Sequence, residues 1–301
     1  MLEIKNVSKR YAGAKSDALS DVSFKVERGE FTALLGQNGA GKSTLINILA
    51  GNVKKDSGSV VIGGYDLDKD ELATKRLIGI VPQEISLDFV FTVREVLRNQ
   101  SGYFGIKNNE RYIDGLLADL SLADRKAEKT RTLSGGMKRR LLIGKALVHK
   151  PGLLILDEPT AGVDIELRHS LYAFLGRLRD EGVTIILTTH YLEEAEKLCD
   201  RIIVLNRGKV IADDSKSNMM NTLGSGTSME FLFDNEIYAE DLSFLSAYST
   251  SIIDGNRLSI RARKNEIGEI FHKMNEEKMK FTGFTLEPNR LEDVFLQMVK
   301  E

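Results

Sequence analysis

Cysteine, excess positive charge and long apolar runs are all scarce in this chain of 301 residues. The single cysteine, Cys199, excludes an intramolecular disulfide framework and fits a reducing compartment. Lys and Arg total 42 against 44 Asp and Glu, which leaves a formal charge of −2 and no cationic surplus for binding nucleic acid. The longest apolar runs, such as 153–156 and 183–187, have strand length and fall far short of the roughly 18 residues that a membrane span needs.

The N-terminus lacks a basic region followed by an apolar core, so we expect no signal peptide. A hydrophobic fraction of 42% and a charged fraction of 29% are those of an ordinary globular protein. Because 301 residues exceed what a single core usually holds, we expect two domains.

The most informative stretch is FTALLGQNGAGKST at residues 31–44. A strand-like apolar run meets a glycine-rich turn and then a helical segment, which is the context of the phosphate-binding motif G-x-x-x-x-G-K-[ST]. Gly36 and Gly41 let backbone N–H groups curl around phosphate oxygens at the start of the helix. Lys42 would reach the β and γ phosphates, and the Ser43 hydroxyl would bind Mg²⁺.

Three further segments end as buried strands with polar residues at their carboxyl ends. Gln83 follows the strand 77–83, and His190 ends the strand 183–190. The apolar run 153–156 leads into Asp157, a carboxylate that needs a partner such as Mg²⁺, and then into Glu158, which is placed to take a proton from water. For the other three histidines we expect structural roles: His149, His169 and His272.

Several other segments carry weaker signals. Short strands at 2–5 and 22–35, the latter with a hairpin turn at 27–30, predict an antiparallel region. Tyr11 stands in a polar loop and either stacks on a base or is an exposed loop tyrosine without a ligand. A helical lobe is expected at about 84–145, and within it Ser-Gly-Gly at 134–136 starts a helix that can hold an anion. The basic trio 138–140 that follows is expected to be a solvated helix face.

The composition changes after the last strands of this region. Residues 213–228 are rich in Asp, Ser, Asn and Gly without periodicity, which predicts a linker between a domain at 1–220 and a domain at 229–301. The order strand, helix, strand, strand, helix, strand and final helix predicts a small α+β domain of ferredoxin-like type.

In this order the motifs resemble the ATP-binding subunit of an ABC transporter over about residues 2–220. The resemblance rests on Tyr11 in an aromatic loop, GQNGAGKST (36–44), Gln83, LSGGM (133–137), LLILDE (153–158), AGVD (161–164) and His190. Met137 stands where most members of the family have Gln, and Gln37 stands where Pro is common. The resemblance implies that neither side chain contacts phosphate. The implied fold is an α/β P-loop NTPase cassette with a RecA-like core sheet, an antiparallel β subdomain and an inserted helical lobe.

The resemblance implies ATP and Mg²⁺ as ligands and two cassettes facing each other head to tail. Catalytic roles fall to Glu158, His190, Lys42 and Gln83, and metal ligation to Ser43, Gln83 and Asp157. The residues implied to bind ATP are Tyr11, Gly36, Asn38, Gly39, Ala40, Gly41, Lys42, Ser43, Thr44 and Asp164 from one cassette, with Ser134, Gly135 and Gly136 from the other.

By the same resemblance the chain is an ATPase that powers an integral-membrane permease, works as a homodimer and lies on the cytoplasmic face of the membrane. The segment PNRLEDVFL at 288–296 is similar to the closing motif of the ABC-2 exporter branch. An importer subunit and a soluble ABC ATPase acting on nucleic acid or ribosomes are the alternatives. Against the DNA-repair type, no long coiled-coil insert fits between Lys42 and Asp157, which lie only 115 residues apart. The single cassette argues against the translation-factor type.

Overall fold

The computed structural model describes residues 1–160, 165–222, 226–263 and 266–287, together with 291, 292, 295 and 298. The chain forms two compact units, Met1–Ser215 and Lys216–Glu301. The first unit contains two sheets and the second unit contains one, and each unit has its own hydrophobic core.

The first unit contains an antiparallel sheet with one buried face. Its strands, in spatial order, are β2 (Leu19–Val26), β1 (Leu2–Lys9), β4 (Ser57–Ile62) and β5 (Tyr65–Asp66). Buried and exposed residues mostly alternate along β2, as they do in a strand that has water on one side. The antiparallel region expected near the N-terminus is therefore confirmed.

A six-stranded sheet forms the centre of this unit. Its strands, in spatial order, are β10 (Lys209–Ser215), β9 (Arg201–Asn206), β3 (Phe31–Leu35), β8 (Thr184–Thr188), β7 (Leu153–Asp157) and β6 (Ile78–Val81). The five strands from β9 to β6 run parallel, and β10 joins the edge as an antiparallel strand. The carboxyl ends of the parallel strands consequently meet at one edge, where open α/β sheets bind their ligands.

The hairpin expected between residues 22 and 35 is wrong. All five residues of β3 are buried, and β3 pairs with β8 on one side and β9 on the other, so it has no free edge for β2. Glu27–Glu30 instead carries the chain from one sheet to the next. By contrast, β9 and β10 do form a hairpin. Its turn residues Arg207 and Gly208 have φ values of 47° and 77°, the positive pair that a two-residue type I′ turn requires.

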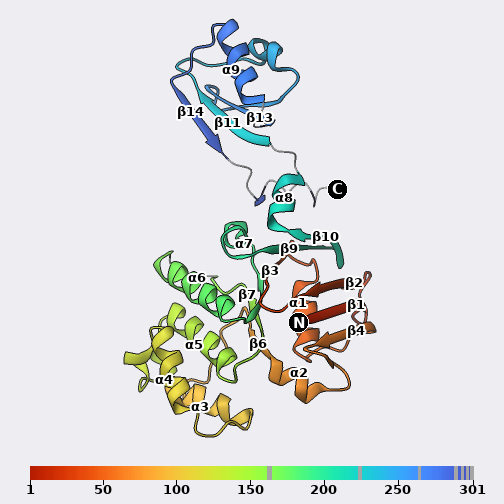
Figure 1. Cartoon of the computed structure of the whole chain (residues 1–301), viewed down its shortest axis with the longest axis vertical. Coiled ribbons are helices and arrows are strands. Elements are labelled where there is room, and N and C mark those ends of the chain that lie inside the picture. Colours follow the sequence, from red (N-terminus) through yellow and green to blue (C-terminus); the bar gives the residue numbers. More distant parts are fainter. Residues whose placement is uncertain are drawn as a thin grey trace. The chain divides into compact units, whose positions relative to one another are not determined.

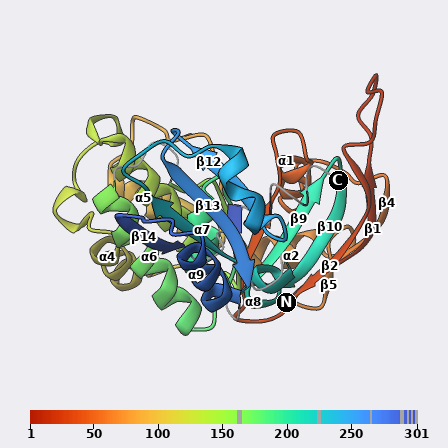
Figure 2. The ribbon, with the colours of Figure 1, turned by 90° about the horizontal axis from the view of Figure 1, so that it is seen from above.

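Helices cover the central sheet on both sides. Figures 1 and 2 show the antiparallel sheet and α1 (Lys42–Leu49) on one side of the unit and the helical lobe on the other. Buried residues of α1, such as Leu45 and Ile48, share one core with residues of both sheets. The remaining helices of the unit are α2 (Glu71–Leu77), α3 (Val93–Tyr103), α4 (Glu110–Asp119), α5 (Gly135–Leu147), α6 (Ile165–Asp180) and α7 (Leu192–Leu198), with short 3₁₀ turns η1 (Ala123–Arg125) and η2 (Thr130–Thr132).

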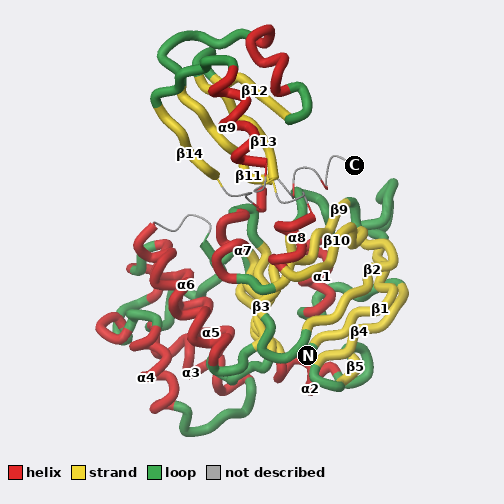
Figure 3. The backbone as a smooth tube through the Cα atoms, turned by 45° about the horizontal axis from the view of Figure 1, so that its top comes forward, coloured by secondary structure: helices red, strands yellow, loops and turns green. Residues whose placement is uncertain are grey.

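The second unit is an antiparallel sheet covered by helices, as Figure 3 shows. Its strands, in spatial order, are β12 (Ser249–Ile253), β13 (Arg257–Arg263), β11 (Gly226–Leu232) and β14 (Gly283–Glu287). Its helical elements are α8 (Lys216–Thr222), the 3₁₀ helix η3 (Ala239–Leu245) and α9 (Ile267–Glu276). This element order and strand order confirm the expected ferredoxin-like fold, although the first covering helix is 3₁₀ rather than α.

The segment 213–228, expected to be an irregular linker, contains the end of β10, the helix α8 and the start of β11. The helix was not predicted because five of the seven residues of α8 are polar, and the buried Met219 is one of only two apolar residues there. Of the expected final helix, the described residues 291, 292, 295 and 298 are helical. Leu291 is buried, Phe295 and Met298 are half-buried, and Val294 lies outside the described residues.

Candidate functional site

A cavity of about 410 Å³ lies at the carboxyl edge of the central sheet. Residues from the phosphate loop, from the end of β6 and from the end of β7 line it. The lining residues are Ala18, Asn38, Gly39, Ala40, Gly41, Lys42, Ser43, Thr44, Gln83, Asp157 and Glu158. The structure thus brings together ten residues that the sequence assigned to nucleotide, metal or catalysis, from segments more than a hundred residues apart.

The phosphate loop adopts a conformation that requires its glycines. Gly41 precedes α1 with a φ of 107°, and a Cβ there would lie 2.5 Å from the carbonyl oxygen of Ala18. A Cβ on Gly36 would lie 2.4 Å from the carbonyl oxygen of Leu205 on β9. Side chains at either position would push the loop away from the sheet, so these glycines are needed for the close approach.

Lys42 folds back over the loop. Its ammonium donates hydrogen bonds to the carbonyl oxygens of Gly36 at 2.6 Å and Gln37 at 3.2 Å. Burial lowers the pKa of Lys42, while the carboxylates of Glu158 and Asp157 act in the opposite direction. An anion bound in the loop would compensate the Lys42 ammonium for its lost hydration. A partly buried lysine in this position is therefore suited to bind phosphate.

Asp157 and Glu158 are held by the neighbouring strand β8. The register of the sheet pairs Asp157 with Thr188, whose hydroxyl donates a hydrogen bond to the Asp157 carboxylate. The Glu158 N–H donates to the Thr188 carbonyl oxygen at 3.0 Å. Glu158 has a φ of 47°, a left-handed conformation that is costly for a residue other than glycine. Such strain persists only where surrounding contacts fix it, and here it occurs at the predicted proton acceptor.

The Glu158 carboxylate is the meeting point of two other predicted residues. Gln83 Nε2 donates to Glu158 Oε2 at 2.9 Å, and His190 Nδ1 lies 3.2 Å from the same oxygen. The Glu158 side chain is only 13% exposed, whereas that of His190 is 51% exposed and lies outside the residues that line the cavity. The three side chains come from the ends of β6, β7 and β8, as the sequence predicted for groups at one edge of a parallel sheet.

Arg139 lies beneath this cluster and was not predicted there. The trio 138–140 was expected to be solvated, but Arg139 is only 3% exposed and Lys138 and Arg140 are half-buried. The Arg139 guanidinium donates to backbone carbonyl oxygens on both sides of the cluster, at the end of β6 and at the end of β7. A signal was present in the sequence, because Arg139 shares the spacing of the buried Leu142, Ile143 and Ala146 on α5.

Thr188 was missed as well. It ends the apolar strand β8 as a hydroxyl among aliphatic side chains, and its fully buried position leaves that hydroxyl in need of a partner, which it finds in Asp157. The signal available in the sequence was the position of this hydroxyl at the end of an apolar strand.

Tyr11 and residues 134–136 were also predicted for the site but are not among the residues that line the cavity. The hydroxyl of Tyr11 lies 3.4 Å from Thr44 Oγ1, which places its ring beside the phosphate loop. Ser134 caps α5 by accepting a hydrogen bond from the Met137 N–H, and residues 134–136 are not among those lining the cavity. The segment AGVD at 161–164, including Asp164, lies outside the described residues.

The described residues lack two features. No helix among them is both long enough and apolar enough to span a membrane. In the same part of the chain, no three His, Cys, Asp or Glu side chains cluster as they would in a preformed metal centre.

Comparison with known proteins gives the same picture. The ABC transporter family matches residues 19–161. The linearmycin resistance ATP-binding protein LnrL of Bacillus subtilis is 41% identical over 232 residues, which are 76% of this chain and 74% of that protein. The Nod factor export ATP-binding protein I of Burkholderia orbicola is 34% identical over an alignment of 308 positions, which covers 99% of this chain and 96% of that protein.

Solved structures also resemble the chain. A structure described as the ATP-binding subunit of an ABC transporter has a TM-score of 0.69 at 33% identity, covering 74% of this chain and 93% of its own. A dimeric ATP-binding cassette in a post-hydrolysis state with ADP and phosphate has a TM-score of 0.65 at 30% identity, covering 71% of this chain and 98% of its own. The phosphate loop shares its cavity with Gln83 and Glu158, and His190 contacts the Glu158 carboxylate. Together with the relatives and solved structures above, this site shows that the chain belongs to the ABC transporter family as an ATP-binding, ATP-hydrolysing subunit.

Proposed function

We propose that this chain is the ATPase of a membrane exporter and that it hydrolyses ATP at the cavity of the phosphate loop. The observation that carries the proposal is the Glu158 carboxylate, which lines that cavity and is contacted on one oxygen by both Gln83 and His190. A buried carboxylate at the mouth of a phosphate site is suited to accept a proton from an attacking water.

Each side chain then has a distinct role. Glu158 polarises the water as general base, and Lys42 leaves its loop carbonyls to neutralise the β and γ phosphates. Gln83 and His190 hold Glu158 and reach the γ-phosphate, so that its presence or loss changes their contacts. The N–H groups of residues 38–44 bind the phosphates, and Tyr11 packs on the base.

Mg²⁺ fits the donor set of this cavity. Ser43, Asp157 and Gln83 all line it and offer a hydroxyl, a carboxylate and an amide oxygen, which are the hard ligands that Mg²⁺ takes alongside phosphate oxygens. When bound, the ion would neutralise charge on the phosphates.

A complete site needs a second copy of the chain. The helix start at Ser134, Gly135 and Gly136 is an anion-binding geometry that does not face the cavity of its own chain. In a head-to-tail homodimer these groups would contact the γ-phosphate of the partner's ATP, and Asp164 would approach the same interface. A relative solved as a dimer with ADP and phosphate supports this arrangement.

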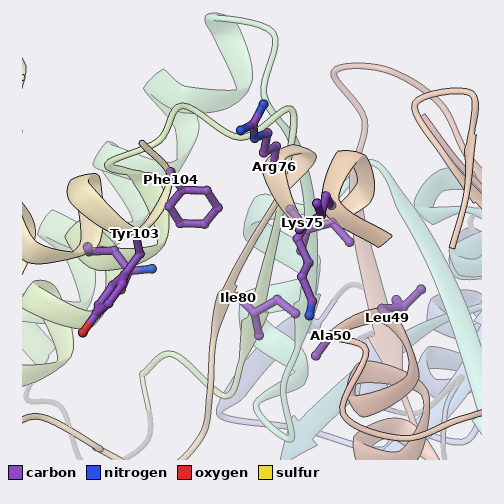
Figure 4. Close-up of a pocket in the computed structure, with 10 residues that line it drawn as sticks. Leu49, Ala50, Lys75, Arg76, Ile80, Tyr103 and Phe104 are labelled. Carbon is purple, nitrogen blue, oxygen red and sulfur yellow. The ribbon is translucent and has the colours of Figure 1, made fainter. Parts of the chain in front are cut away.

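The membrane subunit would dock on the segment that follows Gln83, at about residues 84–105. Phe89 and Val90 are 56% and 70% exposed, which argues against the alternative of a loop folded back into the core. At its far end from Phe89 and Val90, α3 ends beside a hollow of about 490 Å³, shown in Figure 4. Apolar residues of α1, β6 and α3 line this hollow together with Lys75 and Arg76 of α2. An amphipathic cytoplasmic segment of a permease fits such a surface, and the chain would then sit on the inner face of the membrane.

The direction of transport follows from the relatives, several of which are named as export ATP-binding proteins over nearly the full length of this chain. Inside-out membrane vesicles from cells that make the chain and its permease test this. ATP added outside should drive accumulation of an amphiphilic dye, and the Glu158→Gln variant should abolish it. Accumulation confined to right-side-out vesicles loaded with ATP would show an importer instead.

A further inference from the structure

We propose that Arg139 is a positioning residue for hydrolysis, which fixes the backbone of Gln83 and Glu158 from beneath the site. The inference rests on the proposed role of Glu158 as general base. No sequence motif of the phosphate site includes Arg139, and its side chain does not line the nucleotide cavity.

All five N–H groups of the Arg139 guanidinium donate to backbone carbonyl oxygens. Nη1 donates to Pro82 and, at 3.0 Å, to Gln83. Nη2 donates to Asp157 at 2.6 Å and to Glu158. Nε donates to Pro159 at 2.9 Å. Arginine has five donors in one rigid plane, so the guanidinium saturates its capacity and joins the end of β6 to the end of β7.

Burying a guanidinium cation costs free energy unless other interactions compensate for its lost hydration. Arg139 is only 3% exposed, and burial lowers its pKa, while Asp157 and Glu158 act in the opposite direction through their charges. Neither of those carboxylates is hydrogen-bonded to the guanidinium, whose partners are all carbonyl oxygens. The cation therefore stabilises a backbone shape rather than an ion pair.

The shape it stabilises is the strained one at Glu158. With φ at 47°, the Glu158 N–H points to Thr188 on β8, while its carbonyl oxygen accepts from Arg139. The carbonyl oxygens of both peptide groups that flank the Glu158 Cα thus accept hydrogen bonds from Arg139. The same guanidinium holds the Gln83 backbone, and the Gln83 side chain contacts the Glu158 carboxylate. Loss of the guanidinium frees both ends of that contact together.

The test compares Arg139→Lys and Arg139→Met in the full-length chain with wild type. Lysine keeps the charge but has three donors on one atom and cannot span both strand ends. A displacement of about 1 Å at a catalytic group can cost about 100-fold in rate, so we expect kcat of both variants to fall by about that factor. The KM for ATP and the Kd for ADP should stay within threefold, because the phosphate loop is untouched.

The matched control is Arg177→Met, which removes an arginine from an exposed ion pair with Asp119 on the same unit and should keep wild-type kcat. Hydrogen–deuterium exchange adds a readout that turnover does not give. Peptides covering residues 82–84 and 156–160 should exchange faster in Arg139→Lys than in wild type, with the rest of the first unit unchanged.

Three results would overturn the proposal. They are a kcat within threefold of wild type in both variants, a parallel loss of ADP binding that shows collapse of the whole site, and unchanged exchange in both peptides. If Arg139→Met does not fold, Arg139→Lys decides alone, since it retains the charge and most of the volume. A wild-type chain without ATPase activity would instead refute the proposed function. In that case the hydrogen–deuterium exchange result alone would test whether Arg139 stabilises the backbone.

Discussion

Glu158→Gln replaces one carboxylate oxygen by an amide nitrogen and keeps the shape of the side chain. We expect kcat to fall by about 100-fold or more, since general-base catalysis typically contributes that factor, while Mg-ATP still binds. Phosphate release and nucleotide titration measure the two effects. The variant should also accumulate as an ATP-stabilised dimer in size-exclusion chromatography. Near-normal turnover would remove Glu158 from the role of general base.

Lys42→Ala removes the ammonium that bonds the Gly36 and Gln37 carbonyl oxygens and faces the predicted phosphates. Both nucleotide affinity and hydrolysis should fall, because the alanine variant has no cation to offset the phosphate charge. The exposed Lys25→Ala, which disrupts only a surface pair with Glu27, serves as control. An ATP titration of Lys42→Ala that matched wild type would show the phosphate-loop assignment to be wrong.

His149 gives a prediction for pH. Its ring stacks on Phe104 with centroids 3.8 Å apart, and its Nε2 lies 2.9 Å from the Ile78 carbonyl oxygen. Burial lowers the pKa of His149, so the folded state binds its proton less readily than the unfolded state. The stabilisation is then fully present above the unfolded pKa of about 6.5 and is lost as pH falls through the lower folded pKa.

Thermal unfolding of wild type and His149→Gln between pH 7.5 and pH 5 checks this. The glutamine variant has no titrating group at this position, so its Tm should fall less over the interval than the Tm of wild type. Equal slopes of Tm against pH in the two proteins would contradict a protonation cost at His149.

At the scale of elements, the segment before α3 carries the docking prediction. Phe89 is 56% exposed, and the ammonium of Lys138 lies 5.5 Å from the centre of its ring. Phe89→Glu should uncouple transport and leave the basal ATPase of the isolated chain intact, because the residue is on the surface and outside the nucleotide cavity. ATPase assays with and without the permease measure this. Tyr238→Glu, an exposed aromatic of the second unit, is the control. Loss of folding in Phe89→Glu would favour a structural role.

The sequence was most informative where an element ends. Strands that run from apolar residues into Gln83, Asp157 or His190 were placed correctly, because a parallel sheet puts carboxyl ends at one edge whatever the order of its strands. The pairing of strands was harder to predict, because nothing in the local sequence of Phe31–Leu35 indicates that both neighbouring strands lie beyond residue 180. Arg139 was misjudged for a related reason: its partners are backbone carbonyls, which have no signature in the sequence.

At the scale of the whole molecule, the second unit is predicted to act in assembly rather than in chemistry. Residues Lys216–Glu301 have their own sheet and core, and none of those that the structure describes lines the nucleotide cavity. Truncation after about residue 220 should leave ATP binding measurable but raise the protein concentration at which ATPase activity is half-maximal. A truncated chain with full-length specific activity at every concentration would point to a private contact with the membrane subunit.

The position of β3 between β8 and β9 has a consequence for synthesis on the ribosome. The phosphate-loop strand is made first, but its two partners follow about 150 residues later, a delay of roughly 10 to 30 seconds at ordinary elongation rates. During that interval β3, whose five residues are all buried in the folded chain, has two unpaired edges, because the strands that complete its sheet have not yet been made. A nascent chain arrested before β8 should therefore be cut by protease near residue 31 and bind chaperones, and protection should appear abruptly once β9 has emerged.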